Sequence, residues 1–269
     1  MKRFLTILTL VSMVLFSQVG VNKAYAVQLS CGAAGATSWV YSCVTAVSEI
    51  LKQHSDIDLV VQSTPGSTVH YGMMASGELK MGSGYNPTDY WAWNGIGALF
   101  PESYKGEFYT MIPLARSYFY VIVKKDSPIT KIADLKGKRV FVGDPGSAQA
   151  AGTQDVIKAL SLEMDQIMTD RDEGFEMLKD GRVEALMYGG AAPYSSILAV
   201  ASDIDIRFIP LTGDEQKSIT EVAPYYFAGA IPKDSYDFLD GDIDTVCTYQ
   251  NIVVSKALDS EIVYTMTKT

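Results

Sequence analysis

The stretch Arg139-Val140-Phe141-Val142-Gly143-Asp144-Pro145-Gly146-Ser147-Ala148 determines the fold class that this sequence predicts. Val140 to Val142 form a short apolar run, which predicts a buried β-strand. A turn with two glycines and a proline follows, and residues 148–160 then have the pattern of a helix. Ser147 stands where a helix N-cap is expected. A strand that runs through such a turn into a helix is the building unit of α/β proteins.

The same unit recurs on both sides of this stretch. Strands are predicted at 27–30, 57–62, 79–82, 119–123, 139–142, 185–188 and 206–210. Helices are predicted between and after them, at 39–54, 69–77, 85–100, 131–135, 148–160, 173–178 and 193–200. This alternation favours an α/β fold with mostly parallel sheets and with helices on both faces.

Composition places the chain among globular proteins and argues against one class of function. The 269 residues suffice for one large domain or two medium ones, and the hydrophobic fraction of 48% allows a sizeable core. The net charge is −9, and no basic run is longer than two residues, as in Lys124-Lys125. Because a nucleic-acid-binding protein would show a basic surface, we expect no nucleic-acid partner. A small anion is still compatible, since a local pocket can be positive in a negative protein.

The N-terminus has the three parts of a secretory signal peptide. Lys2-Arg3 is positive, residues 4–16 are mostly apolar, and Ala24-Tyr25-Ala26 matches a cleavage site. The apolar run is shorter than the ~20 residues that a membrane-spanning helix needs. We therefore expect residues 1–26 to be a signal peptide that is cleaved after Ala26. The mature protein would then act in the periplasm or another extracytoplasmic compartment.

Four turns of small residues follow predicted strands and are the first candidates for a binding surface. In open α/β sheets, ligands bind beyond the carboxyl ends of the strands. Glycine permits close approach of a ligand, and the free amides at a helix N-terminus attract anions. Ordinary strand-to-helix turns use the same residue types, so that interpretation stays open for each turn. The turns lie at 32–38, 63–67, 143–148 and 189–193.

Larger side chains near these turns could complete such a site. Arg116 precedes a predicted strand and could clamp a carboxylate with its guanidinium, although a salt bridge explains it equally well. Tyrosine and tryptophan combine an apolar face with a hydrogen-bond donor, which suits small-ligand pockets, but packing in a core is commoner. The aromatic residues near the turns are Trp39, Tyr41, Tyr85, Tyr118, Tyr188, Tyr225 and Tyr226.

The motifs of several enzyme classes are missing from the sequence. It has neither a G-x-G-x-x-G nor a G-x-x-x-x-G-K-[ST] nucleotide motif, and it has no G-x-S-x-G nucleophile elbow. The two histidines, His54 and His70, do not lie near a cysteine in the sequence, so we expect no metal and no cofactor. Three cysteines, Cys31, Cys43 and Cys247, make a poor disulfide framework, and a Cys31–Cys43 pair stays open.

A set of segments in a fixed order carries a family resemblance. The segments are Val60-Val61-Gln62-Ser63-Thr64-Pro65-Gly66-Ser67, Met74-Ala75-Ser76-Gly77-Glu78, Ile132-Ala133-Asp134-Leu135-Lys136-Gly137-Lys138-Arg139-Val140, Gly143-Asp144-Pro145-Gly146-Ser147, Leu178-Lys179-Asp180-Gly181-Arg182-Val183-Glu184-Ala185, Gly190-Ala191-Ala192-Pro193, Pro224-Tyr225-Tyr226 and Ala230-Ile231-Pro232. From about Val27 to Lys268, this ordered set resembles the TAXI proteins, which are the substrate-binding components of TRAP-type transporters.

The resemblance implies a type II periplasmic binding fold, in which two lobes close over a ligand like a hinge. The expected boundaries are 27–115 plus 227–269 for lobe I, 116–226 for lobe II, and hinge strands near 116–124 and 219–230. The chain stops at Thr269, inside a helix predicted from near Glu261, whereas relatives continue by several helical turns. We therefore expect a truncated C-terminus, exposed apolar surface and reduced stability.

The resemblance also implies a function. The protein would be a monomer that captures a small organic anion, such as a glutamate-like amino acid or a dicarboxylate, and delivers it to a TRAP-type membrane permease. Such a receptor is not an enzyme. With the candidates from the residues themselves, the expected ligand-binding residues are Ser38, Trp39, Tyr41, Gln62, Ser63, Thr64, Gly66, Ser67, Ser83, Tyr85, Arg116, Gly146, Ser147, Ala148, Gly190, Ala191 and Pro193.

Two other functions stay open at this point. The same fold could serve as a sensor module that docks on a receptor kinase. It could also support an enzyme with a cofactor linked to Cys247, although a buried structural thiol is the commoner role of such a residue. The bulky Trp39 departs from the pattern of the first turn in TAXI proteins, so the resemblance does not fix the pocket shape or the identity of the ligand.

Overall fold

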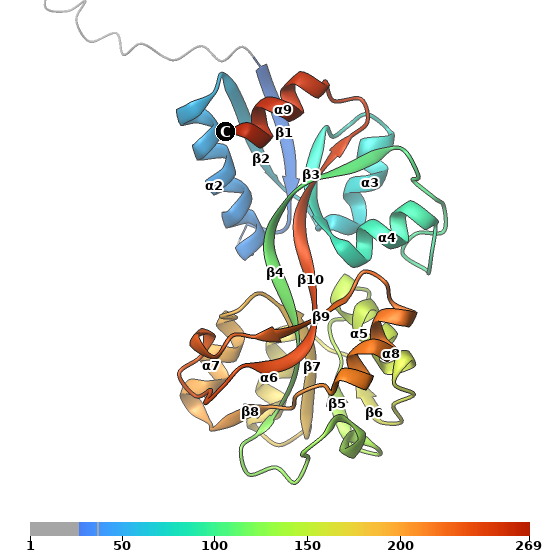
Figure 1. The fold of residues 1–269 in the computed structure, drawn as a ribbon, viewed down its shortest axis with the longest axis vertical. Helices are drawn as coiled ribbons and strands as arrows, with labels where there is room; N and C mark the ends of the chain where they lie inside the picture. The colour runs from blue at the N-terminus through green and yellow to red at the C-terminus, as the bar shows by residue number, and fades with distance from the viewer. Residues whose placement is uncertain (1–26, 37) are drawn as a thin grey trace, which may run out of the picture.

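The chain folds into two α/β lobes that two long strands join (Figure 1). The computed structural model describes residues 27–36 and 38–269. The predicted signal peptide at 1–26 and Thr37 lie outside the described residues. The two-lobe α/β architecture expected from the sequence is confirmed.

The upper lobe of Figure 1 contains the N-terminal part of the chain and the final helix. Its elements are β1 (Val27–Ala33), α2 (Trp39–His54), β2 (Ile57–Ser63), α3 (Ser67–Ala75), β3 (Met81–Tyr85), α4 (Asn86–Asn94) and α9 (Ser260–Lys268). Strand β1 pairs in parallel with both β2 and β3. Helices α2 and α9 contribute to the apolar cluster on one face of this sheet, and α3 and α4 contribute to the cluster on the other.

The lower lobe contains most of the second half of the chain. Its elements are η2 (Ile132–Leu135), β5 (Arg139–Phe141), α5 (Ala148–Ala159), β6 (Asp165–Ile167), α6 (Arg171–Lys179), β7 (Ala185–Gly190), α7 (Ser195–Asp203), β8 (Ile206–Phe208), α8 (Gly213–Val222), β9 (Phe227–Ile231) and η3 (Lys233–Ser235). Strand β5 pairs in parallel with both β6 and β7. Residues 139–148 are therefore β5, the turn that follows it and the first residue of α5.

Two strands run through both lobes, β4 (Phe108–Lys124) and β10 (Ile243–Ser255). They pair antiparallel from Cys247 opposite Tyr118 to Ser255 opposite Phe108. This pairing joins the lobes into one continuous sheet with the order β2-β1-β3-β10-β4-β7-β5-β6. Parallel pairs are confined to the outer strands of each lobe, so the sheet is mixed rather than mostly parallel. The chain passes from the upper lobe to the lower lobe in β4 and returns in β10. These two strands therefore run in opposite directions and pair antiparallel.

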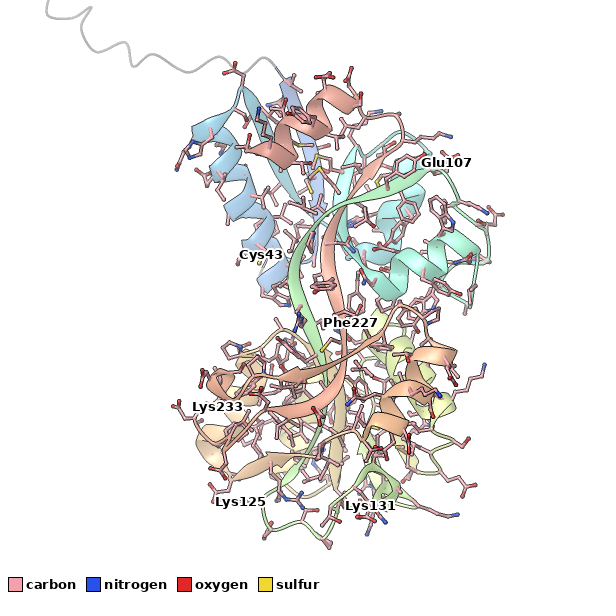
Figure 2. The ribbon with its side chains drawn as sticks, in the orientation of Figure 1. Cys43, Glu107, Lys125, Lys131, Phe227 and Lys233 are labelled. Atoms are coloured by element: carbon pink, nitrogen blue, oxygen red, sulfur yellow. The ribbon has the colours of Figure 1, made fainter. Side chains whose placement is uncertain are left out.

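The second connection between the lobes lies elsewhere than the sequence predicted. The first hinge strand, expected near 116–124, is the second half of β4, but the return crossing is β10 and not residues 219–230. Residues 219–230 form the end of α8 and most of β9, which pairs with the lower half of β10. Lys233, assigned to lobe I from the sequence, accordingly lies in the lower lobe (Figure 2).

The lobes also touch beside the crossing strands. Trp91 of α4 and Tyr225 of the lower lobe meet edge to face, with their ring centroids 5.5 Å apart. Both belong to one apolar cluster that extends through the two lobes. Among residues 27–36 and 38–269, no helix is both long and apolar enough to cross a bilayer.

Candidate binding site between the lobes

A cavity of about 480 Å³ lies between the lobes, close to the crossing strands. Its volume falls in the range of small-molecule sites. Both lobes and β10 contribute to its wall. The lining residues are Ala34, Val40, Pro65, Gly66, Ser67, Thr68, Ser83, Tyr85, Asp144, Gly146, Ser147, Ala148, Gln149, Tyr188 and Gln250.

Two helices begin at this cavity, one from each lobe. Helix α3 begins after Gly66, and no side chain caps its first turn. Helix α5 begins after Ser147, whose Oγ accepts a hydrogen bond from the backbone N–H of Ala150 at 3.0 Å. Gly66 has φ +126° and ψ −169°, a conformation that is essentially restricted to glycine. The positive ends of two helix dipoles thus face one cavity, which favours a negatively charged ligand.

The polar groups of the lining are mostly backbone N–H groups and neutral side chains, and few are ionised side chains. Among the described residues that line the cavity there is no lysine or arginine, and Asp144 is the only carboxylic acid. Asp144 Oδ1 accepts a hydrogen bond from the backbone N–H of Arg171 at 2.6 Å. The carboxylate is therefore already engaged in holding the turn before α5. An anion in this cavity would be bound by N–H and O–H donors.

A buried histidine holds the loops of the upper wall together. His70 of α3 has 0% of its surface exposed, and its Nδ1 lies 2.8 Å from the carbonyl oxygen of Ser83. Because a carbonyl only accepts, Nδ1 carries the proton, and Nε2 lies 2.7 Å from Thr64 Oγ1. Burial lowers the pKa of His70, which favours the neutral ring. A Cβ on Gly82 would come within 2.8 Å of the imidazole, so this packing requires glycine there.

A second polar network runs from the cavity wall into the upper lobe. Thr88 Oγ1 lies 3.1 Å from Ser67 Oγ and 2.8 Å from the hydroxyl of Tyr71. Tyr71 donates to Asp89 Oδ1 at 2.6 Å, and Asn251 Nδ2 donates to Asp89 Oδ2 at 2.6 Å. Burial raises the pKa of Asp89 to about 6, although these two hydrogen bonds act to lower it. The upper wall is thus backed by a carboxyl group that titrates near neutral pH.

One side-chain contact crosses the cavity directly. The hydroxyl of Tyr85, at the end of β3, donates to Gln149 Oε1 of α5 at 3.4 Å. Burial raises the pKa of Tyr85, so the phenol keeps its proton and remains a donor. The two lobes are therefore linked across the site by a long hydrogen bond, which a ligand could replace.

The structure brings part of the predicted site together. Of the residues expected from the sequence, those that line the cavity are Gly66, Ser67, Ser83, Tyr85, Gly146, Ser147 and Ala148. They come from β3, from the turns before α3 and α5, and from the first residues of these helices. This agrees with the principle that ligands meet α/β sheets beyond the carboxyl ends of strands.

The other predicted residues lie outside the lining, namely Ser38, Trp39, Tyr41, Gln62, Ser63, Thr64, Arg116, Gly190, Ala191 and Pro193. Several have structural roles instead. Ser38 caps α2 by accepting a hydrogen bond from the backbone N–H of Tyr41 at 3.2 Å. Trp39 packs against the apolar clusters of both lobes. The carbonyl of Ala191 accepts a hydrogen bond from the hydroxyl of Tyr120 at 3.0 Å.

Arg116 occupies a different environment from the one expected. Its guanidinium lies over the rings of Phe227 and Tyr249, 5.7 and 6.0 Å from their centroids. Phe227 lies at the junction of the lobes (Figure 2). Among the described residues, Arg116 forms no ion pair. It therefore makes cation–π contacts in place of the alternative salt bridge, and it lies outside the lining of the cavity.

Sequence reasoning missed several polar residues of the lining, including Thr68, Asp144, Gln149 and Gln250. Thr68 and Gln149 follow directly on predicted turns, so extending each turn by two residues into its helix would have found them. Gln250 lies on β10, where only the pairing of that strand with β3 brings it to the cavity. No local signal marks it.

The structure gives no support to a cofactor on Cys247. The side chain is buried, and burial raises the pKa of its thiol to about 11. Its Sγ packs so closely against Gly229 that a Cβ there would lie 2.7 Å away. Cys31 and Cys43 are also free thiols, so the pair left open by the sequence is not formed.

Solved structures of other proteins share this architecture. A TctC solute-binding protein from Polaromonas is 17% identical, with a TM-score of 0.58 over 90% of this chain and 82% of that chain. The probable amino-acid ABC transporter extracellular-binding protein ytmK from Bacillus subtilis is 12% identical, with a TM-score of 0.54 over 90% and 89%. XAC2383 from Xanthomonas citri, bound to chloride, is 8% identical, with a TM-score of 0.52 over 90% and 82%. The fold is therefore that of the two-lobe periplasmic binding proteins.

The family follows from a separate comparison with the sequence. The model of the NMT1-like family matches residues 31–269. The chain therefore belongs to the NMT1-like family.

Proposed function

We propose that this chain is an extracytoplasmic solute-binding protein, which captures a small organic anion between its lobes and delivers it to a membrane transporter. One observation carries the proposal: α3 and α5 begin at the same cavity from opposite lobes. An anion that accepts hydrogen bonds from both helix N-termini would stabilise the closed arrangement of the lobes. Binding and closure would thus be one event, as hinge-type receptors require.

The finer assignment rests on the ordered motifs of the sequence. The ligand would be a glutamate-like amino acid or a dicarboxylate, and the partner would be a TRAP-type permease of the kind that TAXI proteins serve. The protein would act as a monomer after removal of residues 1–26. The seven predicted residues that line the cavity would hold the ligand, together with Thr68, Gln149 and Gln250.

A thermal-shift screen of amino acids and mono- and dicarboxylates tests the proposal. A ligand at 100 times its Kd stabilises the folded state by about 2.7 kcal/mol, which is readily measured. We expect at least one organic anion to raise the melting temperature. The matched neutral amide should not, because it lacks the charge that the helix N-termini favour.

A pair of variants then locates the bound anion. Ala148→Glu places a carboxylate in the cavity at the first residue of α5, and Ser195→Glu places one at the first residue of α7, away from it. Acidic residues stabilise helix N-termini, so both variants should fold. Ala148→Glu should weaken anion binding at least tenfold, while Ser195→Glu should not. Equal binding by both variants, or no anion that binds the unmodified protein, would refute the proposed site.

A further inference from the structure

A second cavity opens beside the anion cavity. Its volume is about 520 Å³, and it shares Gly146 and Ser147 with the first. The remaining wall is formed by α4 and the following turn in the upper lobe, and by α5 and the end of α8 in the lower lobe. The two cavities therefore meet at the N-terminus of α5.

Both lobes contribute exposed hydrophobic side chains to the wall of the second cavity. Nine large hydrophobic side chains of the described residues are exposed, and four of them line this one cavity. Tyr90 and Ile96 belong to the upper lobe, and Met168 and Val222 belong to the lower lobe. Exposed apolar residues that stand singly need no explanation, whereas a facing group of them indicates a binding surface.

Two of the polar groups in this wall already have partners. The hydroxyl of Tyr225 donates to Asp155 Oδ2, and Gln154 Nε2 donates to Gln166 Oε1 at 2.8 Å. These groups therefore have fewer free donors and acceptors for a polar ligand. Trp91 packs edge to face on Tyr225 beside them. The second cavity thus combines exposed hydrophobic side chains from both lobes with two charged residues, Asp155 and Lys158, whereas two helix N-termini lie open at the first.

We propose that the two cavities form one bipartite site and that its ligand is an amphipathic carboxylate. The charged head lies at the N-terminus of α5, and an apolar body extends along α5 between Ile96 and Met168. Helix α5 has 12 residues and is about 18 Å long, so it is long enough to contact an alkyl chain of several carbons along its length. This inference rests on the proposed function, because the head is the anion that the first cavity binds. It replaces the compact amino acid or dicarboxylate proposed above with a carboxylate that carries an apolar chain.

Isothermal titration with unbranched carboxylates, from butanoate to decanoate, tests the inference. Each methylene that enters an apolar cavity should tighten binding by about two- to fourfold. The double variant Ile96→Ala with Met168→Ala removes one exposed side chain from each wall. It should lose at least tenfold in affinity for decanoate and leave butanoate within twofold. Ala151→Phe, which narrows the cavity from α5, should also act on decanoate alone.

Leu198→Ala is the matched control. Leu198 is as exposed as Met168, at 46% against 44%, and does not line the cavity. Leu198→Ala should leave the affinities for butanoate and for decanoate unchanged. An affinity that does not depend on chain length, or a dependence that survives in the double variant and in Ala151→Phe, would overturn the bipartite site while leaving anion capture intact. If no carboxylate, amino acid or dicarboxylate of any length bound, the proposed function itself would fail.

Discussion

The two walls of the anion cavity present the same feature, a helix N-terminus, but different interactions hold them in place. In the upper lobe, α3 lacks a side-chain cap, and two polar groups, the buried His70 and the half-buried Asp89, support its start. In the lower lobe, Ser147 caps α5 directly, and the helix packs through Val156 and Ile157 onto the apolar core. The position of the upper wall therefore depends on buried partners and protonation, and that of the lower wall depends on packing.

The largest expected effect comes from removing the histidine that organises the upper wall. In His70→Leu, the carbonyl of Ser83 and the hydroxyl of Thr64 lose a buried partner, which should reduce the free energy of unfolding by about 3 kcal/mol. His54→Leu makes the same replacement at an exposed site and should change the free energy of unfolding by less than about 0.5 kcal/mol. Denaturant unfolding measures both. Equal stabilities of the two variants would show that the polar network does not support the upper wall.

The second prediction concerns pH. Because the pKa of Asp89 rises from 3.8 to about 6 on folding, its contribution to stability is complete below pH 3.8 and is lost as pH rises through 6. The loss should reach about 3 kcal/mol by pH 7. Asp89→Asn cannot titrate, so the wild type should lose stability relative to this variant between pH 4 and pH 7.

Unfolding curves of both proteins across this pH range measure the difference. Asp240→Asn, at an exposed position, controls for the change in net charge. Burial lowers the pKa of His70, whose contribution is lost as pH falls through the unfolded value of 6.5. That effect is common to all three proteins and cancels in the comparison. Parallel pH profiles for the wild type and Asp89→Asn would contradict the prediction.

The smallest expected effect compares the glycines before the two helices. Gly66 has φ +126°, which only glycine adopts easily, whereas Gly146 has φ +75°, in the left-handed region that other residues can enter. A Cβ would meet no atom within 4 Å at either site, so the backbone alone decides the cost. Gly66→Ala should cost about 2 kcal/mol and Gly146→Ala about 1 kcal/mol in denaturant unfolding. If Gly146→Ala were more destabilising than Gly66→Ala, the turn before α3 would accommodate alanine without backbone strain, and the prediction would be wrong.

Much of the fold could be predicted because its signals are local. Helix α2 spans Trp39–His54, as its apolar spacing predicted, and the strand-turn-helix unit around Ser147 forms as expected. Strand β4 was predicted at 119–123 from its apolar run and near 116–124 from the resemblance, yet it spans Phe108–Lys124. Its first half contains strand-favouring residues such as Tyr109 but is interrupted by Pro113, and pairing with β10 keeps it extended.

The sequence predicted residues of the candidate site only where a turn of small residues precedes a helix. Glycine and serine before helices indicated the residues around Gly66 and Ser147, and both groups reach the cavity. Arg116 and Gly190 also lie near turns or strand ends, but Arg116 packs over the ring of Phe227 and Gly190 lies against the ring of Tyr194. Proximity to a turn in the sequence does not determine which side of a sheet or hinge a residue occupies.

By itself, the sequence determined the α/β class and the starts of helices such as α2 and α5, because backbone propensities and apolar periodicity act within a few residues. The two-lobe organisation came from the family resemblance that its ordered motifs carry. Tertiary structure alone decided that β10 is the return crossing, that Gln250 reaches the anion cavity and that a second cavity with exposed hydrophobic side chains lies beside it. These features depend on segments more than 100 residues apart, such as Tyr85 and Gln250, meeting in one sheet. Which partner a strand pairs with follows from burying the surface of the whole chain, and no local pattern records it.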